Sequence, residues 1–87
     1  MHADHTTIEL GAETDGDLMR RLHGAVAAHG GTIDLASHDV GGTEEYICYE
    51  IVLPDGALQA IAETALGLRL SGPEVLVVRL AAAIRAA

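Results

Sequence analysis

Glycine, proline and acidic residues cut this sequence into short segments, and this division limits what the chain can fold into. Breaks fall at Gly30-Gly31, Gly41-Gly42, Pro54 and Ser71-Gly72-Pro73. Between two such breaks there is room for one strand or one short helix, because these residues interrupt both kinds of element. The 87 residues therefore predict one domain, 1–87, with 1–5 and 81–87 as peripheral tails.

Four segments are expected to be strands. Thr6 to Leu10 and Thr32 to Ser37 alternate polar and apolar residues, which is the period of a half-buried strand. Tyr46 to Leu53 is rich in β-branched and aromatic residues, and the Gly41-Gly42 pair before it predicts a hairpin. The valine-rich segment Glu74 to Leu80 is the fourth expected strand.

Two segments are expected to be helices. The first runs from about Asp17 to His29, where apolar residues recur at helical spacing and Asp15 or Asp17 can cap the start. The second would be capped by Asp55 and end near Gly67. Its expected apolar stripe consists of Leu58, Ile61, Ala62, Ala65 and Leu66.

This order of elements predicts a ferredoxin-like βαββαβ fold of the α+β class, with a four-stranded antiparallel sheet and both helices on one face. A chain of this size buries only about 60% of its unfolded surface. The third and fourth strands also carry more apolar residues than one buried face needs. We therefore expect a homodimer that forms through an uncovered sheet face or edge.

Charge and aromatic content argue against two classes of partner. Thirteen acidic residues against five arginines, with no lysine, give a net charge of -8, which repels nucleic acids and anionic membranes. Two tyrosines, with no Phe or Trp, offer little surface on which bases could stack. No apolar run approaches the length needed to cross a bilayer. Neither nucleic acid nor a membrane is expected as a partner.

The cysteine content and the N-terminus predict a location. The single cysteine, Cys48, cannot close an intrachain disulfide. The start MHADHTTIEL lacks the basic residues and apolar core of a secretory signal. We therefore expect a cytoplasmic protein.

The segment Thr14 to Ser37 resembles the signature of the ACT domain, a small regulatory ferredoxin-like module that senses amino acids and similar metabolites. Asp15-Gly16-Asp17-Leu18 stands where that family has an acidic-Pro-Gly-Leu turn, and Gly30-Gly31-Thr32-Ile33 where it has a Gly-Gly-Asn-Ile element. The likeness covers roughly Thr6 to Val78. It implies allosteric regulation by a non-catalytic domain that binds a small metabolite, such as an amino acid, at a homodimer interface without a cofactor.

The resemblance also implies a ligand site around the first turn. The residues concerned are Gly11, Ala12, Asp15, Gly16, Asp17, Leu18, Thr32, Ile33 and Asp34. A glycine before a helix lets a ligand approach the backbone, where free amides at the positive helix end attract a carboxylate. The alternative is that Gly16 only makes a turn and that Asp15 or Asp17 only caps the helix, where Asp17 would compete with an anion.

Two other kinds of function stay open. The segment Cys48 to Leu53 resembles the metal-binding ACT-like half of nickel-responsive repressors, and His38 with Cys48 and a carboxylate could hold nickel, copper or zinc. A small ferredoxin-like enzyme could use Asp34, His38, Tyr46 and Glu50 on the open sheet face. No nucleophile motif or complete ligand set can be specified, so we predict neither catalysis nor a metal site.

Overall fold

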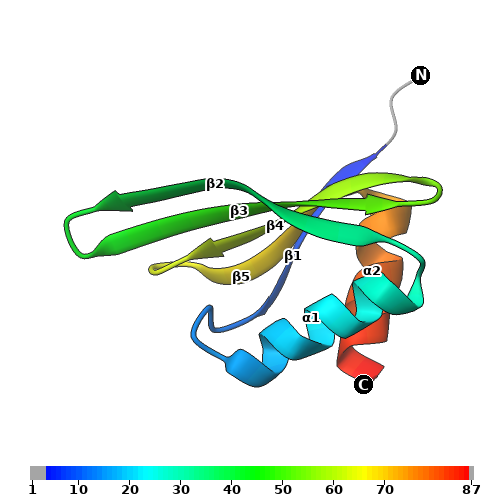
Figure 1. The fold of residues 1–87 in the computed structure, drawn as a ribbon, viewed down its shortest axis with the longest axis horizontal. Helices are drawn as coiled ribbons and strands as arrows, with labels where there is room; N and C mark the ends of the chain where they lie inside the picture. Colours follow the sequence, from blue (N-terminus) through cyan, green and yellow to red (C-terminus); the bar gives the residue numbers. More distant parts are fainter. Residues whose placement is uncertain (1–3, 87) are drawn as a thin grey trace.

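Five strands form one antiparallel sheet in the computed structural model, which describes residues 4–86 (Figure 1). The elements in chain order are β1 (His5–Gly11), α1 (Gly16–Ala28), β2 (Thr32–Gly41), β3 (Glu44–Leu53), β4 (Gly56–Glu63), β5 (Gly67–Pro73) and α2 (Glu74–Ala86). The strand order is β1-β5-β4-β3-β2, so β2 to β5 form a meander and β1 pairs with β5. β1 and β2 are the two edges of the sheet.

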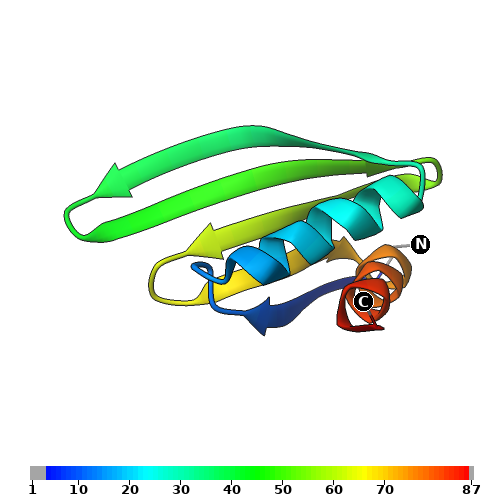
Figure 2. The same cartoon turned by 60° about the horizontal axis from the view of Figure 1, so that its bottom comes forward.

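Both helices pack against the same face of the sheet. α1 connects the two edge strands and crosses this face, while α2 packs against α1 and the β1, β4 and β5 strands (Figure 2). The far end of the β2–β3 hairpin projects beyond both helices in Figure 1 and Figure 2. Within residues 4–86, no helix covers the opposite face of the sheet.

The hydrophobic core lies between the helices and the sheet. Alternate residues of the three inner strands point into it, as the pleat of a strand requires. The buried set comprises Ile51, Leu53, Leu58, Ala60, Ala62, Leu68 and Leu70 from the strands, with Leu18, Leu22, Ala25, Val26, Leu76, Val77, Leu80, Ala81 and Ile84 from the helices. Tight turns join the strands, and Gly42 takes a φ of 61° in the β2–β3 turn, where glycine is favoured.

The sequence correctly predicts the first half of the fold. The first strand, the first helix and the hairpin near Gly41-Gly42 all form within a few residues of their expected bounds. β2 is longer than expected, because it continues through a bulge to Gly41.

The segment after Pro54, expected to be a helix capped by Asp55, is a strand instead. In β4, Leu58, Ala60 and Ala62 point into the core at every second position. Alanine, leucine, glutamine and glutamate favour helices in isolation, but pairing with β3 and β5 overrides that preference. Three members of the expected helical stripe therefore lie elsewhere. Ile61 is buried on the opposite face, Ala65 is exposed in the turn after β4, and Leu66 is 55% exposed.

The segment Glu74 to Leu80, expected to be a strand, is the first half of α2, and the expected tail from residue 81 forms the second half. Its buried residues recur near helical spacing only when the whole of Glu74–Ala86 is considered together. Glu74 in the first turn and Arg85 in the last complement the helix dipole. The predicted four-stranded ferredoxin-like topology is therefore wrong: the sheet has five strands, and the second helix comes last in the chain.

Candidate functional site

The residues of the predicted ligand site lie at opposite ends of α1. Gly11 to Leu18 cover the end of β1, the turn and the start of the helix, whereas Thr32 to Asp34 begin β2 after the helix has ended. A helix of 13 residues is about 20 Å long. Within one chain the structure does not bring the two groups together.

Asp15 occupies the amides of the predicted cradle. Its Oδ1 accepts hydrogen bonds from the N–H groups of Asp17 at 3.0 Å and Leu18 at 3.1 Å. Asp17 in turn forms ion pairs with Arg20 and Arg21. A Cβ added at Gly16 would meet nothing within 4 Å, so the turn does not need a glycine there for reasons of space. This local geometry is that of a capped helix start.

A β-bulge separates the residues considered as metal ligands. The register shifts between Leu35 and Ser37, so that Ser37 pairs with Cys48 while His38 pairs with Ile47. Cys48 therefore faces the open side of the sheet, and His38 faces the helix side, where its Nε2 lies 2.6 Å from Glu45 Oε2. Among residues 4–86, no three His, Cys, Asp or Glu side chains come together as a metal site.

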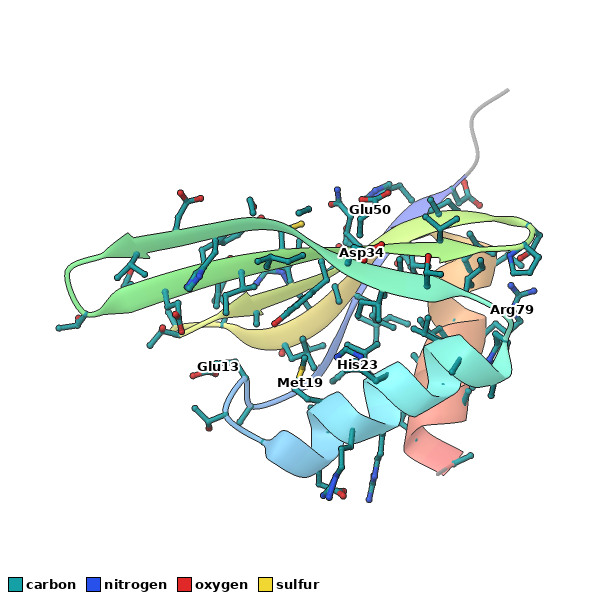
Figure 3. The ribbon with its side chains drawn as sticks, in the orientation of Figure 1. Glu13, Met19, His23, Asp34, Glu50 and Arg79 are labelled. Atoms are coloured by element: carbon teal, nitrogen blue, oxygen red, sulfur yellow. The ribbon has the colours of Figure 1, made fainter. Side chains whose placement is uncertain are left out.

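The open face is acidic along β2 and β3. Asp34 lies directly opposite Glu50 in the ladder, and Figure 3 shows both on the side of the sheet away from α1. Tyr46 shares this face, so the bulge excludes only His38 from the group considered for catalysis. From β2 to the end of β3 the hairpin carries five acids and no arginine: Asp34, Asp39, Glu44, Glu45 and Glu50.

A shallow pocket of about 160 Å³ opens at the far end of this hairpin. The residues that line it include Asp39, Glu44, Tyr46 and Glu63, whose side chains belong to the open face, and Glu45, whose carboxylate is bonded to His38 on the helix side. Asp39, Tyr46 and Glu63 lie side by side on adjacent strands. Arg69 already bonds Glu63 at 2.6 Å, which leaves Asp39 and Glu44 without an arginine partner in the part of the chain described. Carboxylates beside a tyrosine ring suit a cationic side chain.

Among the described residues no strand pairs with the outer edge of β2, so this edge has free backbone hydrogen-bonding groups. Glu45 lies opposite Val40, but its N–H bonds Thr64 Oγ1 at 2.8 Å and its C=O bonds the Thr64 N–H at 3.1 Å, both toward β4. In an antiparallel ladder, two opposite residues either exchange two N–H···O=C bonds or both point their N–H and C=O groups away from each other. The N–H and C=O of Val40 therefore point outward, away from β3.

The same alternation applies along the whole of β2. His38, Leu35 and Ile33 lie opposite Ile47, Tyr49 and Ile51. Ile47, Tyr49 and Ile51 lie two, four and six positions after Glu45 along β3. Their backbone groups therefore point toward β4, as those of Glu45 do. Four residues of β2 thus present outward N–H and C=O groups: Ile33, Leu35, His38 and Val40.

Apolar side chains accompany these groups on the helix side of the hairpin. Leu35 is 60% exposed and Val40 is 69% exposed, and the far end of the hairpin, where β2 ends at Gly41, projects beyond α1 (Figure 1). β2 contains neither proline nor lysine, two residues that commonly protect edge strands; it carries one bulge and two exposed acids, Asp34 and Asp39. This edge was not among the predicted site residues, although the sequence carries a signal for it: Ile33 and Leu35, followed by His38 and Val40, alternate with a one-residue offset.

The charge state of Cys48 follows from its surroundings. The thiol is 7% exposed and lies between the open-face side chains of neighbouring strands. Burial first, and the negative charge of Glu50 second, raise the pKa of this thiol from its usual 9.0. At neutral pH Cys48 is therefore a protonated thiol with the character of a small buried hydrophobe.

No known protein family, curated protein or solved structure matches this chain. Within the described residues, neither helix is long and apolar enough to span a bilayer. The topology also differs from the ferredoxin-like fold of ACT domains. The expectations of amino-acid binding and allosteric regulation depended on that resemblance, so the free edge of β2 and its acidic surroundings are the stronger candidate.

Proposed function

We propose that this chain is a non-catalytic protein-binding domain that captures an extended segment of a partner protein along the free edge of β2. The observation that carries the proposal is the row of outward backbone groups at Ile33, Leu35, His38 and Val40 on an edge strand of 10 residues. An added strand would satisfy these groups and extend the sheet, which is a recurring way of binding peptides.

The two faces of the hairpin specify which segment would fit. On the helix side, Leu35 and Val40 offer apolar contact. On the open side, Asp34 and Asp39 flank the edge, and the acidic pocket lies beside Asp39. Because side chains of a strand alternate between faces, the bound segment would alternate apolar and basic residues.

Charge favours a basic partner at this edge over a second copy of the chain. Each copy would bring the five acids of its own hairpin to a β2–β2 contact. Like charges that face each other across an interface oppose association, and opposite charges speed it. The partner that satisfies both the backbone and the carboxylates is therefore a basic segment.

We also propose that the domain has no catalytic activity and that it is located in the cytoplasm. Asp34, Tyr46 and Glu50 share a face, but His38, the other member of that group, lies on the opposite face. The location is proposed because the chain has one cysteine, which is buried as a free thiol.

The test is a titration with a short synthetic peptide in which valine alternates with arginine. We expect binding at least about tenfold tighter than that of the matched valine–glutamate peptide, and weaker binding as salt rises. Val40→Pro removes one outward N–H without breaking a bond to β3 and should reduce the affinity, whereas Val40→Thr, which keeps that N–H, should not. Equal binding of both peptides, or full affinity in a folded Val40→Pro variant, would overturn the proposal.

A further inference from the structure

The outer face of α2 is apolar, which is unusual for a helix on the surface of a domain. Val75 is 73% exposed and Val78 is 49% exposed. Ala82 and Ala86 are exposed as well, and the four side chains recur at helical spacing. We call Val75, Val78, Ala82 and Ala86 the outer stripe. A surface helix normally turns charged and polar residues to solvent, so this stripe lacks a partner within the described chain.

The arginines of α2 are directed to the sides of the outer stripe. Arg79 forms two hydrogen bonds with Asp55 in the β3–β4 turn, at 2.8 and 2.9 Å. Arg85 donates to the carbonyl oxygen of Glu9 in β1 at 3.2 Å. Neither side chain needs to cover the stripe, which is left free for another apolar surface.

The charge of α2 indicates which apolar surface covers the outer stripe. α2 contains one acid and two arginines, a formal charge of +1, in a chain whose net charge is -8. It is therefore a place where two copies can meet with little of the repulsion that the hairpin would cause. Glu74 and Arg85 stand at opposite ends of the helix, and their separation is close to three full turns, so they lie on the same flank of the stripe.

We infer that a second copy of this chain docks on the outer stripe, with the two α2 helices antiparallel. A two-fold axis between Val78 and Ala82 places Val78 of each copy against Ala82 of the other. In an antiparallel pair the same flanks face each other, so Glu74 of each copy then meets Arg85 of the other. The contact is self-complementary in shape and in charge, and it contains two such ion pairs.

This interface leaves the proposed binding edge free. α2 packs against α1, β1, β4 and β5, whereas β2 is the opposite edge of the sheet. The inference therefore does not depend on the proposed function, and each can fail without the other. A dimer built in this way would carry two β2 edges.

Sedimentation equilibrium at high micromolar concentration tests the inference. We expect a mass of about 18 kDa, twice the 9.0 kDa of one chain. Val78→Glu should give monomers. Val52→Glu is the matched control: both valines are 49% exposed, but Val52 lies on the open sheet face, so this variant should stay dimeric. Circular dichroism of both variants checks that they are folded. A monomeric parent chain, or a dimer that Val52→Glu breaks and Val78→Glu does not, would overturn the inference.

A charge exchange tests the antiparallel register. Glu74→Arg and Arg85→Glu should each weaken the dimer by at least about tenfold, and the double variant should recover most of the loss, because the pair is restored with reversed charges. The expected recovery supports the antiparallel arrangement. A double variant that is weaker than both single variants would contradict it.

Discussion

At the scale of single residues, glycines that look alike in the sequence differ in what they do. Gly24 lies in the middle of α1, and a Cβ added there would meet nothing within 4 Å. A Cβ at Gly31 would lie 2.6 Å from the Val52 carbonyl oxygen and 2.6 Å from Leu53 Cδ2. The first glycine weakens a helix, whereas the second permits the close approach of the chain to β3.

This difference gives a prediction for two matched substitutions. Gly24→Ala should stabilise the fold by about 1 kcal/mol, because alanine favours the helix and restricts the unfolded chain. Gly31→Ala should destabilise it, because backbone atoms must move to admit the methyl group. Urea unfolding of the two variants measures both changes, and a stable Gly31→Ala variant would contradict the packing described here.

The Cys48 thiol gives a second prediction at this scale. Because its pKa is raised by burial and by Glu50, the thiol should react with iodoacetamide more slowly than free cysteine at the same pH. Glu50→Gln removes one of the two causes and should speed the reaction. An unchanged rate in the Glu50→Gln variant would show that burial alone protects the thiol.

The same shift has a consequence for stability. The folded chain holds the thiol proton more tightly than the unfolded chain does, because the folded pKa lies above 9.0. The associated contribution to the free energy of unfolding is therefore present below pH 9.0 and is lost as the pH rises through the raised pKa of the folded thiol. The pH profile of a Cys48→Ala variant should lack this loss.

At the scale of elements, the sequence predicts those whose pattern and propensity agree. β1, α1 and β3 belong to this group, and all three form near their expected bounds. In β4, helix-favouring residues concealed a period of two, and in α2 the run of Val75 to Val78 concealed a helical period. Pairing between β4 and its two neighbours, and packing of α2 on the sheet, decide these cases, and both are long-range effects.

The contact between α2 and the β3–β4 turn makes a prediction about pH. The Arg79 guanidinium bonded to Asp55 lowers the pKa of that carboxyl below its usual 3.8. Because the folded pKa is depressed, the stabilisation is present above pH 3.8 and is lost as pH falls through the depressed value. Asp55→Asn should therefore lower the melting temperature at neutral pH, and the difference from the parent chain should vanish in acid. A difference that persists at the lowest pH would show that the ion pair is not its cause.

At the scale of the whole molecule, charge and exposed apolar surface divide the domain into two parts. The hairpin of β2 and β3 is acidic and has a free edge, and α2 is close to neutral and has an apolar outer stripe. The sequence alone shows the acidic balance and the excess of apolar residues. It does not show which edge is free or which face is bare, because both depend on the strand order and on the final position of α2.

The free edge of β2 is the central claim, and amide hydrogen exchange tests it most directly. In the unbound chain the amides of Asp34, Ser37 and Asp39, which face β3, should exchange slowly, and those of Ile33, Leu35, His38 and Val40 should exchange fast. Adding the valine–arginine peptide should slow the second group and leave the first unchanged. Slowing confined to β1 or α2, or no slowing in β2 at saturating peptide, would contradict the claim.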